Sequence, residues 1–191
     1  MGNRGRTLHN AQQEIVRSYG GKRWICCLLE FKGRRRQIMS PGQYTELFFL
    51  DEATAFAAGH RPCAECRRER YKAFRAAWMK WNVHDQAKRL SAEEIDAQVH
   101  PTRINTKRQK VTYEATLNSL PNGVFVAIDG SSYLVWDQSL LLWSPEGYTR
   151  ELPRPNDTTV TVLTPKPFVE CLRQGYQPGT HWSHLSLFGN R

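Results

Sequence analysis

Two cysteines separated by two residues lie in a proline-containing turn, and this pair constrains the fold more strongly than any other part of the sequence. Cys63 and Cys66 follow Pro62, and their spacing lets both sulfurs reach one tetrahedral ion at about 2.3 Å. Arginines on either side of the turn favour the ionised sulfur that a metal requires. A thioredoxin-like redox pair would follow a strand of a βαβ unit, whereas here a helix-forming segment and a glycine come first. The spacing therefore favours a metal site, with zinc as the ion, over a redox pair or inert thiols.

The third ligand is expected from a predicted strand over residues 23–31. Cys26 and Cys27 are neighbours there, so their side chains point to opposite faces and only one of them is expected to reach the ion. Cys27 shares its face with Ile25 and Leu29, which favours it as the inward-facing ligand. Either cysteine could equally be a buried small hydrophobe, because free cysteine is among the most buried residue types.

The fourth ligand is expected to be His60, which precedes the turn by two positions. His9, or Cys26 after a local bulge in the strand, are the alternatives. Each has a structural interpretation too: His60 as a turn residue and His9 as a solvated side chain of a polar arm. Cys171 lies in an apolar segment and is predicted to be a core residue.

The composition is that of a globular protein with an apolar core. Apolar residues make up 40% and charged residues 24% of the 191 positions, which excludes a disordered, collagen-like or coiled-coil chain. The longest apolar runs are far shorter than the roughly 20 residues of a membrane helix, so no membrane partner is expected. The first residues lack a secretory signal and the five cysteines are an odd number. We therefore expect a cytoplasmic protein without a disulfide framework.

Positive charge is concentrated in one part of the chain. Residues 1–110 contain 22 Lys and Arg against 11 Asp and Glu, whereas residues 111–191 contain 5 against 7. A concentrated positive field attracts polyanions, so nucleic acid is the expected partner, although a solvated basic surface would have the same composition. The residues predicted to contact nucleic acid are Arg34, Arg35, Arg36, Arg61, Arg67, Arg68, Lys72, Arg75, Arg103, Lys107 and Arg108.

Local patterns predict an α+β fold with two lobes and a preceding arm. The first 22 residues are polar and Gly-rich and are expected to form a loosely held arm. A zinc-binding lobe of short strands and helices follows over 23–100, and an antiparallel β-rich lobe over 111–191. In the first lobe, strands are expected at 23–31 and 44–50 and helices at 51–59, 67–81 and 85–99, the last with a capping box from Ser91 to Glu94 and ended by His100 and Pro101. In the second lobe, strands are expected at 124–128, 133–136, 140–143 and 159–163, a helix at 168–174 and an irregular tail at 177–191.

The segment from Leu47 to Cys66 resembles a known metal-binding module. Its order is a strand ending in aromatic residues, a helix ending in Ala-Ala-Gly, and then His-Arg-Pro-Cys-Ala-Glu-Cys. This is similar to the second half of the metal-binding domain of Ada, the bacterial methylation-damage repair family. The resemblance covers about residues 47–66 and nothing after Trp81. It implies a zinc-centred module that contacts DNA rather than RNA.

One departure from that family limits what the resemblance implies. The Ada family takes its other two ligands from an upstream Cys-x-x-x-Cys segment, one cysteine of which accepts a methyl group from DNA. This chain has no such segment, so methyl transfer to the protein itself is not expected.

The sequence thus predicts a zinc-containing nucleic-acid-binding protein that acts in DNA repair or in the recognition of modified DNA. One alternative is an enzyme, such as a nuclease or glycosylase, that acts on damaged or modified nucleic acid with His100 or His181 as acid or base. The other is a zinc-stabilised module that binds an acidic protein. No recognisable nuclease, glycosylase or hydrolase pattern joins the histidines, so catalytic residues cannot be assigned from the sequence.

Overall fold

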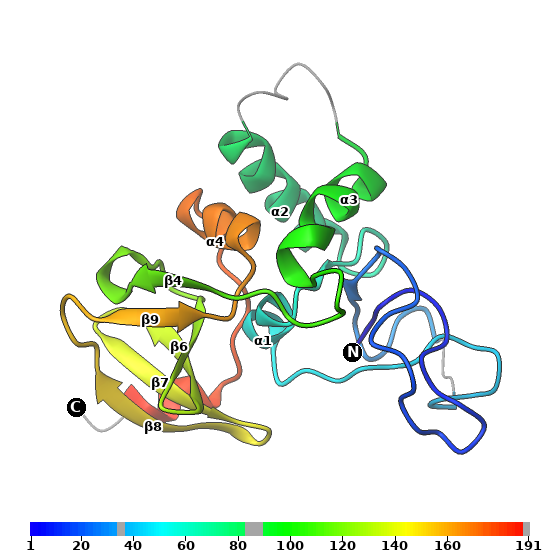
Figure 1. The fold of residues 1–191 in the computed structure, drawn as a ribbon, viewed down its shortest axis with the longest axis horizontal. Coiled ribbons are helices and arrows are strands. Elements are labelled where there is room, and N and C mark those ends of the chain that lie inside the picture. The colour runs from blue at the N-terminus through cyan, green and yellow to red at the C-terminus, as the bar shows by residue number, and fades with distance from the viewer. Residues whose placement is uncertain (34–36, 83–89, 189–191) are drawn as a thin grey trace.

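The structure is a computed structural model that describes residues 1–33, 37–82 and 90–188 (Figure 1). It contains two separate sheets together with helices, which confirms the predicted α+β class. The N-terminal residues lie at the opposite end of the molecule from the larger sheet (Figure 1). None of the helices in the described ranges has the length and apolar character needed to cross a membrane.

The smaller sheet has three strands of two residues each. β1 pairs antiparallel with β2, and β2 pairs parallel with β3. Three helices belong to the same part of the chain, and α2 packs near β3. The elements are β1 (Gly2–Asn3), β2 (Ile25–Cys26), α1 (Glu52–Ala57), β3 (Arg61–Pro62), α2 (Arg68–Trp81) and α3 (Ala92–Arg103).

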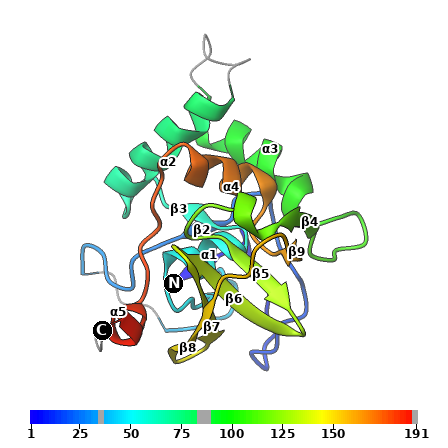
Figure 2. The ribbon, with the colours of Figure 1, turned by 90° about the vertical axis from the view of Figure 1, so that its left-hand side faces the viewer.

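The larger sheet is antiparallel, with strand order β4-β9-β5-β6-β7-β8. Helices α2, α3 and α4 lie together beside it, and α5 packs on β8 (Figure 2). The elements are β4 (Tyr113–Thr116), the 3-10 helix η2 (Leu117–Ser119), β5 (Phe125–Ile128), β6 (Ser131–Trp136), β7 (Ser139–Ser144), β8 (Gly147–Pro153), β9 (Thr159–Val162), α4 (Lys166–Arg173) and α5 (Ser183–Phe188).

Local signals placed several of these elements correctly. The side chain of Asp51 accepts a hydrogen bond from the Thr54 amide at 2.7 Å and caps α1. The hairpin of β5 and β6 turns at Asp129 and Gly130, whose φ angles of 48° and 76° suit a tight two-residue turn. The elements that were not predicted are β1, β3, β4, β8, η2 and α5; the last falls in the tail that was expected to be irregular.

Three expectations for the N-terminal part are wrong. The arm is not loosely held, because Gly2 pairs with Cys26 in the small sheet and Leu8 is only 1% exposed. The strand expected at 23–31 forms only over Ile25–Cys26, and the one expected at 44–50 is reduced to an isolated bridge between Leu47 and Gly2. Strand-forming residues alone did not suffice, since a strand extends only as far as its partners do.

The capping box of α3 is present, but the helix runs further than expected. Ser91 and Glu94 bond each other's backbone amides. The helix passes Pro101 and ends at Arg103. A proline inside a helix loses its own N–H bond and crowds the carbonyl four residues before it. Here the last turn is held by Arg103, which donates to the carbonyl of Gly59 at 2.9 Å. Residues 85–89 of the predicted helix lie outside the described residues.

One hydrophobic core connects the two predicted lobes. Phe56 of α1 and Phe74 of α2 are fully buried in the same cluster as Val126 of β5 and Phe168 of α4. Phe56 also contacts Phe168, with ring centroids 4.7 Å apart. The sheets are therefore separate but the apolar core is continuous, so the boundary near residues 100–110 does not divide two independent cores.

Candidate metal centre

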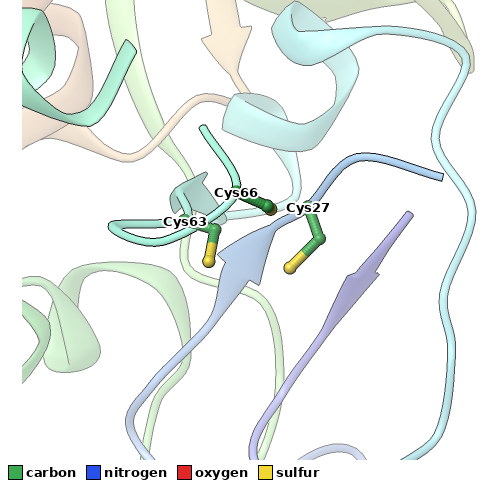
Figure 3. A group of neighbouring side chains, drawn as sticks. All are labelled: Cys27, Cys63 and Cys66. Atoms are coloured by element: carbon green, nitrogen blue, oxygen red, sulfur yellow. The ribbon is translucent and has the colours of Figure 1, made fainter. Parts of the chain in front are cut away.

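Three cysteine sulfurs lie close together just after the ends of β2 and β3. The sulfurs of Cys27, Cys63 and Cys66 all lie within 4.8 Å of one another. Figure 3 shows the three side chains at the end of β2 and in the turn that follows β3. In a tetrahedral site with bonds of about 2.3 Å, sulfurs lie about 3.8 Å apart. Small side-chain adjustments would bring these three sulfurs onto one ion.

The parallel pairing of β2 with β3 brings the sulfurs together. Cys26 is in register with Pro62, so Cys27 and Cys63 each follow a paired residue. The amide of Cys63 donates to the carbonyl of Cys26 at 2.9 Å. The turn then closes as the Arg67 amide donates to the Cys63 carbonyl at 3.1 Å, which carries Cys66 back toward β2.

Backbone amides point at the sulfurs, as they do in metal-binding knuckles. The Leu28 amide donates to Sγ of Cys66 at 3.3 Å. A hydrogen bond from Cys27, together with the amides of Cys66 and Glu65, lowers the pKa of Cys63 to about 5. These donors stabilise thiolates, which are the form that binds a metal.

The other two thiols keep their protons more tightly. The hydrogen bond to Cys63 raises the pKa of Cys27, and burial raises the pKa of Cys66. Without a metal, the group therefore holds one thiolate and two thiols near neutral pH. A divalent ion would supply the positive charge that releases the remaining protons. The donor set fits a soft-binding ion such as zinc.

Cys26 and Cys27 differ in burial, as strand alternation predicts, but the buried residue is Cys26 and not Cys27. Cys26 is the buried member of the pair, at 2% exposure, whereas Cys27 is half-buried and belongs to the sulfur group. The sequence thus selected Cys27 as a candidate on the assumption that the ligand faces inward, and that assumption is wrong. Cys171 is fully buried, as predicted.

The structure places His60 outside the sulfur group. Its ring packs against Trp24 and Phe49, with centroids 5.4 and 4.6 Å away. Its Nε2 accepts a hydrogen bond from Nε of Arg4 at 3.4 Å, and burial holds its pKa well below the usual value. His60 is therefore a neutral core histidine rather than the fourth ligand. The alternative His9 is also buried and bonds to Thr45 Oγ1 at 2.7 Å.

A cavity of about 650 Å³ adjoins the sulfurs, and all three cysteines line it. This volume lies in the range of small-molecule sites. Much of its wall is apolar, and several of these side chains are also exposed to solvent. The apolar members are Met1, Ile25, Leu28, Leu29, Phe31, Ile38 and Phe48. Sequence reasoning missed this cavity; the apolar residues directly after Cys27 were the available signal.

The predicted nucleic-acid contacts fall into four groups. Arg68, Lys72, Lys107 and Arg108 are exposed, and Arg67 and Arg75 are half-buried. Arg34, Arg35 and Arg36 lie outside the described residues. Arg61 and Arg103 are each only 2% exposed.

Arg61 and Arg103 are structural residues, and their prediction as phosphate contacts is wrong. Arg61 forms a buried ion pair with Asp96 at 2.7 Å. Arg103 donates to the carbonyls of Gly59 and Lys22 and lies over the ring of Trp24, 4.4 Å from its centroid. A guanidinium buried in this way cannot reach a phosphate backbone. Sequence alone does not separate such arginines from exposed ones.

The histidines considered as acid or base occupy different surroundings. His100 packs on Tyr19, with ring centroids 5.0 Å apart. The His181 amide donates to Asp51, and its ring contacts Ser183 Oγ at 2.9 Å. Among the residues that the structure describes, neither belongs to the sulfur group.

Comparison with known proteins adds no family to this picture. A search of protein families, of curated proteins and of solved structures finds no match to the chain. The class that the fold and the site define is an α+β protein with a three-cysteine cluster that could hold a metal ion.

Proposed function

We propose that the chain is a zinc-binding protein that binds nucleic acid, with DNA favoured over RNA. The observation that carries the metal part is the meeting of three sulfurs from two distant segments, with amides directed at them. The resemblance of residues 47–66 to the Ada metal-binding module supports zinc as the ion and DNA repair or modified DNA as the context. When bound, zinc would cross-link the end of β2 to the turn after β3.

The nucleic-acid part rests on where exposed positive charge lies. Arg68 and Lys72 are exposed on α2, which begins two residues after Cys66. Lys107 and Arg108 are exposed in the loop after α3. Lys72 has a partner in Glu69 at 2.9 Å, but both side chains are solvated, and such pairs are weak enough to be exchanged for a phosphate. Zinc would fix the start of α2 and so the position of these cations.

Metal analysis of cysteine variants tests the metal part. We expect one zinc per chain in the purified protein and in Cys26→Ala, and loss of zinc in Cys27→Ala, Cys63→Ala and Cys66→Ala. Cys26→Ala is the matched control, because it neighbours Cys27 but does not belong to the sulfur group. Equal zinc content in all variants would contradict the proposal.

A salt series tests the nucleic-acid part. Affinity for duplex DNA should fall steeply with salt, and the triple variant of Arg68, Lys107 and Arg108 to Ala should bind more weakly with a shallower salt slope. The control is Arg150→Ala, which removes an exposed positive charge from β8 in the acidic half. No affinity for DNA or RNA at low salt would reject this part. Tighter binding to RNA than to duplex DNA at the same salt concentration would contradict the preference for DNA.

An enzyme acting on modified nucleic acid is the second candidate, and the cavity beside the sulfurs is the observation that favours it. Turnover in such an enzyme should depend on Cys63, whose thiolate lines the cavity, and survive His100→Ala and His181→Ala. Turnover lost in either histidine variant with zinc content unchanged would instead favour the acid-base scheme expected from the sequence.

A further inference from the structure

We propose that the three-cysteine site is open, and that a small thiol bound in the adjoining cavity completes the coordination of its metal. This inference rests on the metal site proposed above and specifies the ligand class that the site takes. It assigns the fourth position to a molecule from outside the chain rather than to a fourth side chain.

The described residues supply three protein ligands at this place. Within residues 1–33, 37–82 and 90–188, the group of possible metal-binding side chains at this place consists of Cys27, Cys63 and Cys66. Two further candidates nearby in sequence do not belong to this group: Cys26 is 2% exposed, and the His60 ring packs against Trp24 and Phe49. Zinc sites with three protein ligands keep a position open for an exchangeable ligand.

The cavity lies directly against the sulfur group. Because all three cysteines line it, a ligand within the cavity can reach an ion held by their sulfurs. Its volume of about 650 Å³ is larger than one solvent molecule requires and suits a small organic molecule. Phe48 and Leu29 line this cavity and are 56% and 74% exposed to solvent. These exposed apolar side chains would be covered by the apolar body of a ligand.

The fourth donor must suit a metal ion that already has three sulfur ligands. Three thiolates make the bound Zn²⁺ a soft acceptor, and a soft sulfur donor matches it better than a hard oxygen donor such as phosphate. A thiol meets this requirement. In the zinc-loaded site its sulfur would take the open position and its proton would pass to solvent, with no change in oxidation state. The bound thiol is thereby held as a thiolate, the nucleophilic form, at neutral pH.

Cobalt spectroscopy of the full chain tests the inference. The protein is kept reduced with a phosphine, which brings no thiol, and is loaded with Co²⁺. Adding benzyl mercaptan should raise the thiolate-to-cobalt absorption by about one third, from three bound thiolates to four. Benzyl alcohol, which has the same apolar body, should leave it unchanged. Phe48→Ala should keep the cobalt stoichiometry and weaken the affinity for benzyl mercaptan about tenfold.

The outcomes separate this inference from the metal site itself. A chain that binds no cobalt overturns both. A chain that binds cobalt but whose absorption does not respond to the thiol overturns the inference and leaves the metal site standing. Absorption that drops by about one quarter in Cys26→Ala would identify that cysteine as a fourth protein ligand and also overturn the inference. An unchanged thiol affinity in Phe48→Ala overturns the assignment of the thiol to the cavity.

Discussion

The two halves of the molecule are stabilised by different means. In the C-terminal half, six strands form a continuous antiparallel ladder, with registers of up to six paired positions between β7 and β8. In the N-terminal half, the three strands have two residues each. Hydrogen bonds from charged side chains take over there: Lys110 donates to the Ala57 carbonyl at 2.6 Å, and Arg61 pairs with Asp96.

This difference indicates which half would depend on a metal bound by the three cysteines. A sheet of two-residue strands contributes few backbone hydrogen bonds, so a metal that cross-links its strands would have its largest effect there. The sulfur group lies where the short strands meet. The larger sheet needs no such help, because its ladder and the core that it shares with α2 and α4 are extensive.

Metal removal should produce the largest difference between the two halves, measured as the rate of amide hydrogen exchange. With a strong chelator, the amides of Cys27, Cys63 and Arg67 should exchange hydrogen at least about 100-fold faster, because their bonds lie at the cross-link. Amides of β5, β6 and β7 should change by less than about threefold. Hydrogen exchange followed by mass spectrometry measures both. Equal acceleration in the two halves would show that the metal stabilises the whole molecule and not one part.

The pH dependence of metal affinity should be the next largest effect. Above about pH 5, Cys63 is ionised, while Cys27 and Cys66 have raised pKa values and remain protonated. Each ion that binds near neutral pH then displaces about two protons, so affinity should rise about 100-fold per pH unit and fall as the pH is lowered. Competition with a chromophoric chelator between pH 6 and 8 measures this slope. A slope near zero would mean that the thiols are already ionised.

The buried ion pair of the N-terminal half should matter more than a surface pair in the same half. Asp96→Ala leaves Arg61 charged and buried, which should lower the free energy of unfolding by about 3 to 5 kcal/mol. Glu69→Ala is the control, because its pair with Lys72 is solvated, and it should cost less than about 0.5 kcal/mol. Urea unfolding of both variants measures the difference. Similar losses in the two would contradict the structural role given to Arg61.

The smallest effect is expected at the hairpin of the C-terminal half. Gly130 has φ of 76° and open space around its Cβ position. Gly130→Ala should therefore cost only the backbone strain, about 1 kcal/mol, while Ser131→Ala in the same hairpin should be nearly neutral. Thermal unfolding measures both. A loss well above this would mean that the turn is constrained by contacts and not only by its φ angle.

The parts of the fold that were predictable are those specified by adjacent residues. The cap at Asp51 and the turn at Asp129 and Gly130 are local, so their helix and hairpin follow from a few neighbouring side chains. The parallel contact of β2 with β3 is long-range and only two residues long. No period in the sequence marks so short a strand, and the packing of the first 22 residues was missed for the same reason.

The candidate site shows the same limit. The spacing of Cys63 and Cys66 is a local signal, whereas the third sulfur depends on which face of β2 meets the turn. Strand alternation separated Cys26 from Cys27 but could not show which face is buried. His60 carries the correct chemistry for a ligand, and only its contacts with Trp24 and Phe49 reveal it as a core residue.

Native mass spectrometry of the untreated full chain tests the central claim most directly. The account predicts a mass increase of one zinc ion less at least two protons, lost after Cys63→Ala and retained after Cys26→Ala. A chain without a bound metal ion, or one that keeps its zinc after Cys63→Ala, would contradict the account.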